Sequence, residues 1–347
     1  SYGSDVGMKI PWETALGIVF LSGILFVTLS LTNFRVWIMT SIPMSLRRAI
    51  SAGIGSFIAF IGLKQMGMIV SNDATLVSLG DFSNSNVLLG VVGLVLSFSF
   101  YAYRLKGAFI LSIAITSILA WMFTLNETPQ SFFSVPASIS PIFLQLDILS
   151  ALSLSLLPII ITFLITDMFD TLGTLTGVGT RANLFQENNK DDKSLQKTLE
   201  ADAVATVAGS LLGVSTTTAF IESAAGVEEG GRTGLTAIFT ALLFITTLFM
   251  LPLFKSIPSN AIYPVLVVVG VLMFTELGKI NFEDSDLATS AAAFLIVILM
   301  PLTFSITNGI AAGFLIYTLI KIVKREFKDL NIGILIITFI SALAFIL

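Results

Sequence analysis

The sequence contains no cysteine and no histidine among its 347 residues. It can therefore form no disulfide and offers no thiol nucleophile, and the usual Cys/His metal sites are excluded. Histidine, the side chain that most often exchanges protons near neutral pH, is also missing. Any proton that this chain carries must be held by an Asp or Glu in a special environment, or by a Lys.

Charge is the second shortage. Asp, Glu, Lys and Arg make up 12% of the chain, whereas hydrophobic residues make up 55%. An average soluble domain has roughly 25% charged residues, so this chain cannot cover itself with a polar surface and must face lipid. The net charge of −4 predicts no nucleic-acid partner.

Long apolar runs account for this composition. A helix needs roughly 20 mostly apolar residues to cross a bilayer. Runs of this kind predict segments at 12–32, 45–70, 86–104, 106–124, 148–170, 195–213, 215–227, 233–254, 261–278, 286–303, 305–324 and 330–347. The run at 215–227 is too short and polar for an ordinary span, and the last run is either a half-buried hairpin or an additional helix. The sequence thus predicts an all-α polytopic membrane protein.

Connections that contain Lys or Arg alternate with connections that contain few or none, as true membrane spans require. Arg35, Arg47 and Arg48 follow the first run, whereas residues 126–147 contain no Lys or Arg. Because short cytoplasmic loops are enriched in basic residues, we expect the first span to run from outside to inside, with Arg35 in a cytoplasmic connection.

An internal repeat is also visible. The tripeptide Ser-Ile-Pro at 41–43 recurs at 256–258, and Gly55 pairs with Gly270 at the same spacing. An odd number of predicted spans separates the copies, so they face opposite ways, as in inverted-repeat transporters. The repeat also predicts three further spans before residue 12. The alternative is a chance match between two apolar stretches.

Two acidic residues lie within one predicted span. Asp167 and Asp170 are three apart and share a helix face. The small or polar residues Thr171, Gly173 and Thr174 follow and permit close approach of another backbone or a flat ligand. Intramembrane acids are costly and usually functional. The alternative is a helix end whose Asp residues reach headgroup water.

Two further acids lie beyond the predicted connection. Asp202 stands near the start of a helix rich in small residues, where a functional role and a first-turn acid favoured by the helix dipole are equally compatible with the sequence. Glu222 separates the β-branched, aromatic segment 215–221, which predicts extended backbone, from a short helix at 223–226. Extended backbone within a bilayer must be satisfied by protein or a water-filled cavity. A carboxylate there can accept two N–H groups of a ligand, unless it only caps the short helix.

Longer strings carry a family resemblance. TDMFDTLGTL at 166–175, DAVAT at 202–206 and STTTAFIESAAG at 215–226 resemble the hypoxanthine/guanine/adenine permease branch of the nucleobase–cation symporter-2 (xanthine/uracil permease) family. GGRTGLT at 230–236 and MPLTFSI at 300–306 fit the same pattern, and the similarity extends over essentially the whole chain.

The resemblance implies fourteen spans in two inverted repeats of seven, with a core domain that moves against a gate domain. The core would comprise 12–32 and 148–254, and the gate 33–124 and 255–347. This chain would lack about the first three spans. The tenth span would be broken, with a short strand near 215–222.

The resemblance also implies a function: proton-coupled symport of hypoxanthine, guanine or adenine across the plasma (inner) membrane, without enzymatic activity, cofactor or metal. Asp170 and Glu222 would occupy the acidic substrate-site positions. The implied substrate site is Asp170, Thr171, Gly173, Thr174, Thr217, Thr218, Phe220, Glu222 and Ser223. The candidates for proton coupling are Asp170, Glu222, Asp202 and Asp167; burial favours the neutral carboxyl form, so no histidine is needed. The expected partners are the purine base, the proton and the lipid bilayer, with a homodimer as the oligomer to test.

Three other classes compete with this interpretation. An anion exchanger of the same fold would need a positively charged site, but the central residues are acidic. An intramembrane aspartyl protease would need acids facing each other from two helices, but Asp167 and Asp170 share one. A non-transporting homologue is the third alternative.

Overall fold

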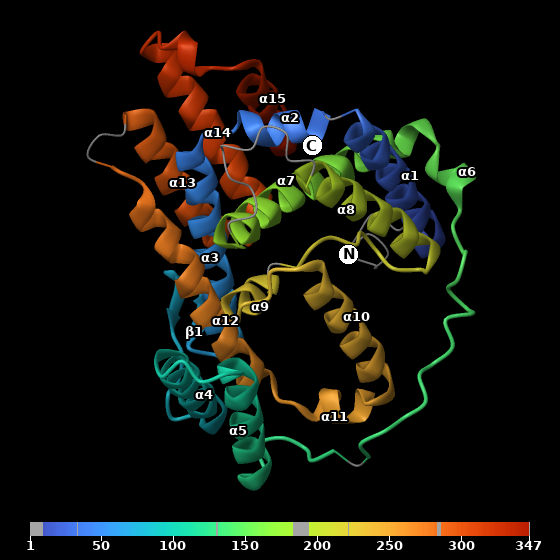
Figure 1. Ribbon diagram of the computed structural model, residues 1–347, viewed down its shortest axis with the longest axis vertical. Coiled ribbons are helices and arrows are strands. Elements are labelled where there is room, and N and C mark those ends of the chain that lie inside the picture. The colour runs from blue at the N-terminus through green and yellow to red at the C-terminus, as the bar shows by residue number, and fades with distance from the viewer. Residues whose placement is uncertain are drawn as a thin grey trace. The chain divides into compact units, whose positions relative to one another are not determined.

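The computed structural model is predominantly helical (Figure 1) and describes residues 10–32, 34–129, 131–182, 194–220, 222–282 and 286–346. The chain forms two compact units. The first unit comprises residues up to 54, 138–221 and 276–347, and the second unit comprises 55–137 and 222–275. The division into core and gate domains expected from the sequence remains a prediction.

The first unit is a bundle of helices. It contains α1 (Trp12–Leu31), α2 (Phe34–Ser41), the first part of α3 (Met44–Gln65), α6 (Ile148–Ala151), the 3₁₀ turn η1 (Leu154–Leu156), α7 (Leu157–Ala182), α8 (Ser194–Leu211), α13 (Leu287–Thr303), α14 (Ile306–Val323), the 3₁₀ turn η3 (Phe327–Asp329) and α15 (Ile332–Ile346). α1 packs against α6, α7 and α8, while α14 packs against α13, α15 and α7. The segment 214–220 follows α8 and joins this unit.

The second unit combines helices with a small hairpin. It contains the remainder of α3, β1 (Ile69–Asn72), β2 (Leu76–Leu79), α4 (Ser85–Ala102), α5 (Ala108–Met122), α9 (Ser223–Glu228), α10 (Gly234–Phe249), α11 (Leu251–Ser256) and α12 (Ser259–Phe274). The 3₁₀ turn η2 (Thr275–Lys279) begins at its last residue. α12 packs against α4, α5 and α9.

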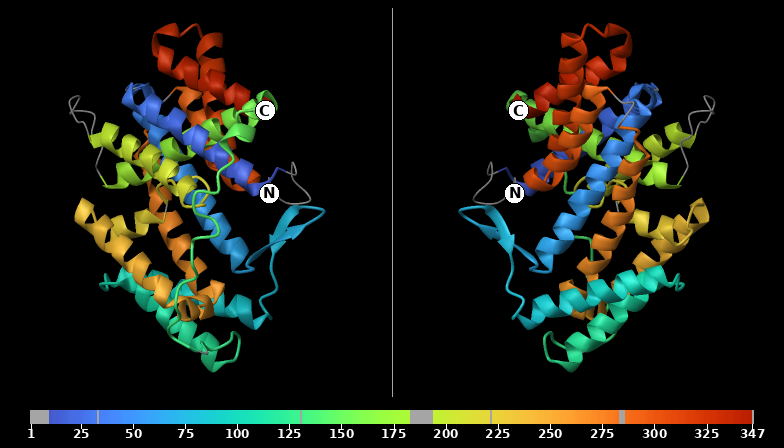
Figure 2. Two further views of the ribbon diagram at one scale, coloured as in Figure 1. Left: turned by 90° about the vertical axis from the view of Figure 1, so that its right-hand side faces the viewer. Right: turned by 90° about the vertical axis from the view of Figure 1, so that its left-hand side faces the viewer.

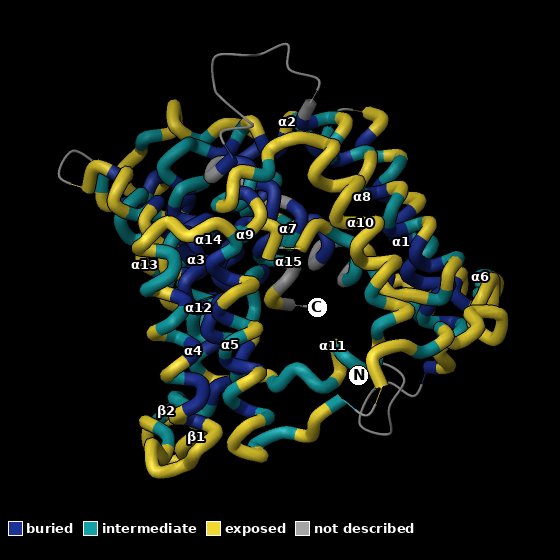
Figure 3. The backbone as a smooth tube through the Cα atoms, turned by 60° about the horizontal axis from the view of Figure 1, so that its bottom comes forward, coloured by how far each residue is buried: buried dark blue, intermediate teal, exposed yellow. Residues whose placement is uncertain are grey.

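The expectation of a multi-span helical membrane protein is confirmed. Among the described residues, five helices are long and apolar enough to cross a membrane: Trp12–Leu31, Met44–Gln65, Ser85–Ala102, Ser259–Lys279 and Ile306–Val323. Shorter apolar helices accompany them. One of these, α10, is apolar along its length and has no buried residue (Figure 3), which fits a surface exposed to lipid.

The sequence left two alternatives for residues 330–347, a half-buried hairpin or an additional helix, and the structure decides between them. Residues Ile332–Ile346 form an additional helix, α15, which packs on α14. The hydroxyl groups of Thr318 and Thr338 lie 2.7 Å apart across these two helices. A half-buried hairpin is therefore wrong.

Three predicted spans have the wrong bounds, and one of them, 233–254, is divided at Met250 into α10 and α11. The helix expected to continue to residue 70 ends at Gln65, where Gly67 takes a left-handed backbone with φ of 75°. A β1–β2 hairpin follows (Figure 2), with Ile69 opposite Leu79 and an Asn72 side chain that accepts from the amides of Ala74 and Thr75.

The span predicted at 148–170 also differs. It is divided into α6, η1 and a long α7 that begins only at Leu157 and continues to Ala182. The break contains Ser153 and Ser155, and Pro158 is the second residue of α7, in the first turn where proline is favoured. Mean hydropathy stays high across the segment, so a search for apolar runs did not locate the break.

Candidate functional site

The acidic pair of α7 lies in the interior of a helix. Asp167 and Asp170 are followed by further helical residues up to Ala182, so the alternative of a helix end in headgroup water is wrong. Asp167 is buried, with 5% of its surface exposed, and Asp170 is half-buried. The helix therefore holds two carboxyl groups on one face well inside an apolar segment.

The small and polar residues after this pair face the protein interior. Thr171 and Thr174 are buried. A Cβ atom added to Gly173 would meet the side chains of Ile306 and Ile54 at 3.1 and 3.2 Å, so this glycine permits close packing of α7 against its neighbours. A contact of Gly173 or Thr174 with a ligand stays a prediction.

The segment 214–220 has no regular secondary structure. The short strand expected near 215–222 is therefore wrong for the described residues, while residue 221 lies outside them. The backbone groups of a strand form hydrogen bonds with a partner strand. In this segment the Thr217 carbonyl instead accepts a hydrogen bond from a side chain, Thr206 Oγ1 of α8, at 2.8 Å. Phe220 is 70% exposed.

Asp202 of α8 connects this segment to α7. Its Oδ1 accepts from Thr218 Oγ1 at 3.2 Å, and its Oδ2 accepts from Thr171 Oγ1 at 2.9 Å. Three of the residues selected from the sequence thus meet at one carboxylate. Asp202 is not a solvated first-turn acid, because its side chain is only 6% exposed.

Arg35, which the sequence did not indicate as a site residue, completes this group. Its position after the first apolar run predicts a cytoplasmic connection, yet it is buried, with 2% of its surface exposed. Its Nη2 donates to Asp202 Oδ2 at 3.2 Å, and its Nη1 donates to Ser30 Oγ and to the Leu199 carbonyl, both at 3.1 Å. The guanidinium also lies 4.3 Å from the ring centroid of Phe26.

The signal that could have revealed Arg35 is its charge partner. An acid such as Asp202 in a helix of small apolar residues requires a nearby cation or a proton. Asp167 interacts electrostatically with both Arg35 and Asp202, and Asp170 with Asp167. We call Arg35, Asp202, Thr171 and Thr218 the Arg35 network; the single Arg35 charge serves the carboxyl groups of Asp202 and Asp167.

Glu222 and Ser223 belong to the second unit, at the start of α9. Glu222 occupies the N-cap position, but its side chain makes no capping hydrogen bond, so the alternative that it only caps the short helix is wrong. Glu222 and Ser223 are both exposed. Their place in a substrate site stays a prediction.

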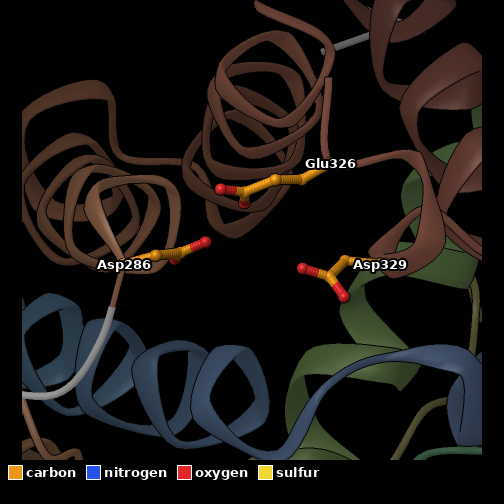
Figure 4. Close-up of side chains that lie close together, drawn as sticks. All are labelled: Asp286, Glu326 and Asp329. Carbon is orange, nitrogen blue, oxygen red and sulfur yellow. The ribbon is translucent and has the colours of Figure 1, made fainter. Parts of the chain in front are cut away.

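A second ionic group surrounds Lys321 near the end of α14. Asp286, which precedes α13, and Glu326 and Asp329, which follow α14, point toward one another (Figure 4). The Lys321 ammonium lies 2.8 Å from Glu326 Oε2 and 2.6 Å from Asp329 Oδ2 and also pairs with Asp286. This ammonium group supplies the positive charge that the three acids require. We call these four residues the Lys321 cluster.

Comparison with known proteins agrees with the motifs. The sequence profile of the Permease family matches residues 3–312. An adenine permease, AdeQ, of Escherichia coli is 39% identical over 340 residues, covering 98% of this chain and 76% of the relative. Two Bacillus subtilis guanine/hypoxanthine permeases are also similar: PbuG is 38% identical over 322 residues, covering 92% of this chain and 72% of the relative, and PbuO is 36% identical over 333 residues, covering 94% and 76%.

These matches confirm the resemblance that the motifs carried. Together with the apolar helices, they identify a multi-pass membrane protein of a transporter class, not an enzyme. The chain belongs to the Permease family, within its nucleobase–cation symporter-2 purine branch.

Proposed function

We propose that this chain transports purine bases across the plasma membrane together with protons. The observation that carries the proposal is similarity over more than nine-tenths of the chain to permeases named for adenine and for guanine/hypoxanthine. A purine is neutral and planar, and its edge presents N–H groups that a carboxylate can accept. Asp170 and Glu222 are the carboxyl groups that we assign to this recognition.

Proton coupling is assigned to the acids of α7. Arg35 forms its ion pair with Asp202, and no ion pair of Asp167 or Asp170 with another cation is seen within the described residues. Buried carboxyl groups in excess of cations favour uptake of a proton. A change in protonation of Asp167 or Asp170 during the transport cycle would link proton movement to substrate movement without a histidine.

The inverted repeat of seven plus seven spans, with core and gate domains, is part of the proposal. Its best support is a reciprocal contact between repeat-related residues of α3 and α12. A Cβ atom on Gly55 would lie 2.5 Å from the Gly270 carbonyl oxygen, and a Cβ atom on Gly270 would lie 2.5 Å from the Gly55 carbonyl oxygen. Equivalent residues meet in this way when they lie beside a pseudo-two-fold axis. We expect a homodimer, to be tested by light scattering in detergent.

No observation favours the anion-exchange alternative. An anion site needs a cation that is free to bind its substrate, whereas the buried Arg35 is occupied by Asp202, Ser30 and the Leu199 carbonyl.

Uptake of labelled adenine, guanine and hypoxanthine into cells without purine uptake of their own tests the proposal. We expect saturable uptake by the unmodified chain and a fall of at least about 100-fold in Glu222→Gln and Asp170→Asn, because an amide offers one acceptor oxygen in place of two and cannot carry the proton. Arg48→Gln, on α3, is a matched control with unchanged uptake; Arg48 donates to the Lys279 carbonyl at 2.7 Å and lies outside the Arg35 network. Undiminished uptake in Glu222→Gln would overturn the role of Glu222, and no uptake by the unmodified chain would favour the non-transporting homologue.

A further inference from the structure

We propose that Arg35 is a positioning residue for substrate binding: through Asp202 it holds the segment 214–220 against α7 and thereby sets the affinity for the purine. The proposal rests on the function proposed above, because it concerns the same site. It assigns a role to a residue that lies outside the predicted substrate set and acts on that set through a carboxylate.

First, Arg35 has one fixed location. Its donors are directed to a side chain on α1, a carbonyl on α8 and Asp202, at distances of 3.1 to 3.2 Å. The ring of Phe26 covers one face of the guanidinium at 4.3 Å. A planar fork held at several points and buried to 2% exposure cannot shift without breaking several contacts.

The second step is that Asp202 transmits this location. Its oxygens accept from Arg35, from Thr171 of α7 and from Thr218 of the segment. Four parts of the chain, α2, α7, α8 and the segment, therefore meet at one carboxylate. Both Thr hydroxyls act as donors to it, an arrangement suited to an ionised carboxylate, which only accepts hydrogen bonds.

The third step is that the segment depends on few contacts. It has no helix or strand hydrogen bonds. Its hydrogen bonds with α8 run from the Val214 amide to the Gly209 carbonyl at 2.9 Å, from the Thr206 hydroxyl to the Thr217 carbonyl, and from the Thr218 hydroxyl to Asp202. The Thr218 contact is the one between two side chains and lies two residues before Phe220. The orientation of the segment's predicted substrate residues consequently depends on Asp202, and Asp202 depends on Arg35.

The fourth step separates this role from proton transfer. Arg35 and Asp167 both interact electrostatically with Asp202, and Arg35 forms the direct ion pair. Asp202 is thus committed to holding the segment, and the coupling proton is left to the acids of α7. A variant that loosens the network should change substrate affinity and leave the pH dependence of uptake in place.

Purine uptake kinetics of the full chain in proteoliposomes test the proposal. Arg35→Lys keeps the charge but not the fork of donors, and we expect its KM to rise about tenfold, the loss equivalent to about one hydrogen bond. The maximal rate per folded transporter should stay within about twofold, and the pH profile should keep its shape. Arg48→Gln is the control and should leave KM unchanged.

A second variant keeps the test decisive if Arg35→Lys does not fold. Thr218→Val removes the hydrogen bond between the segment and Asp202 and leaves the Arg35–Asp202 pair intact; we expect a similar rise in KM, with recovery in Thr218→Ser. An unchanged KM in Thr218→Val, or a loss confined to the amount of folded transporter in Arg35→Lys, would overturn the positioning role. Absence of purine uptake by the unmodified chain would instead overturn the proposed function, so the two failures are distinguishable.

Discussion

The first unit contains two ionic groups that differ in burial and in what they connect. In the Arg35 network, a cation with 2% exposure pairs with a carboxylate with 6% exposure and joins α2, α7, α8 and the segment 214–220. In the Lys321 cluster, a buried ammonium serves three acids at helix ends, and Glu326 and Asp329 are 39% and 53% exposed. The side chains of the first group are too buried for solvent to replace a lost partner, whereas the exposed acids of the second can be hydrated. We infer that the first governs substrate binding and that the second secures the ends of α13 and α14.

Replacement of Arg35 should give the larger loss of stability. Arg35→Met leaves Asp202 buried without its cation, and we expect a loss of about 3–5 kcal/mol in the free energy of unfolding. Thermal unfolding in detergent measures this loss. The double variant Arg35→Met/Asp202→Asn removes the uncompensated charge and should recover at least half of it. A double variant no more stable than Arg35→Met would show that lost packing, not the unpaired charge, causes the effect.

Replacement of Lys321 should cost less. The acids left by Lys321→Met are partly exposed and can be hydrated, so we expect a loss of about 1–2 kcal/mol, between surface and buried ion pairs. The KM for purine uptake should not change. The same unfolding and uptake assays check both values. A loss as large as that of Arg35→Met, or a raised KM, would remove the distinction between the two groups.

The smallest effect concerns the pH dependence of the Lys321 cluster. Burial acts to raise the pKa of Asp286, but hydrogen bonds from Lys321 and from the Thr289 amide outweigh it and hold the pKa below its usual range. A pKa lowered on folding adds stability that is fully present above the unfolded value of about 4 and is lost as the pH falls through the folded value.

We therefore expect the stability difference between the unmodified chain and Asp286→Asn to be constant from pH 6 to 8 and to shrink below about pH 4. Unfolding temperatures measured across this range test the expectation. A difference that grows as the pH falls would contradict the assigned direction of the pKa shift.

The helices that the sequence predicted best are uniform apolar runs bounded by polar residues. The run 12–32 became Trp12–Leu31, and 305–324 became Ile306–Val323. Local hydropathy is sufficient there because the bilayer requirement acts on each helix separately. It is not sufficient at 148–170, where the helix is interrupted between Ala151 and Leu157 within a predominantly apolar stretch, and where α6 and α7 both pack against α1.

The candidate site, like the helices, could be predicted from the sequence only in part. Asp202, Thr171 and Thr218 could be selected one by one as polar residues in apolar surroundings. Their meeting could not be predicted, and neither could the role of Arg35, because its partner Asp202 lies far along the chain and an Arg at the end of a span fits a cytoplasmic loop equally well. Long-range pairing is a property of the fold and not of any local pattern.

The central claim is tested most directly by purified protein in liposomes with an imposed pH gradient and labelled hypoxanthine, guanine or adenine outside. We predict accumulation of at least one of these purines above the outside concentration when the outside is acidic, collapse of that accumulation when a protonophore dissipates the gradient, and none with Asp170→Asn. Equilibration to equal concentrations regardless of the gradient would contradict proton coupling, and no purine entry at all would contradict the proposed function.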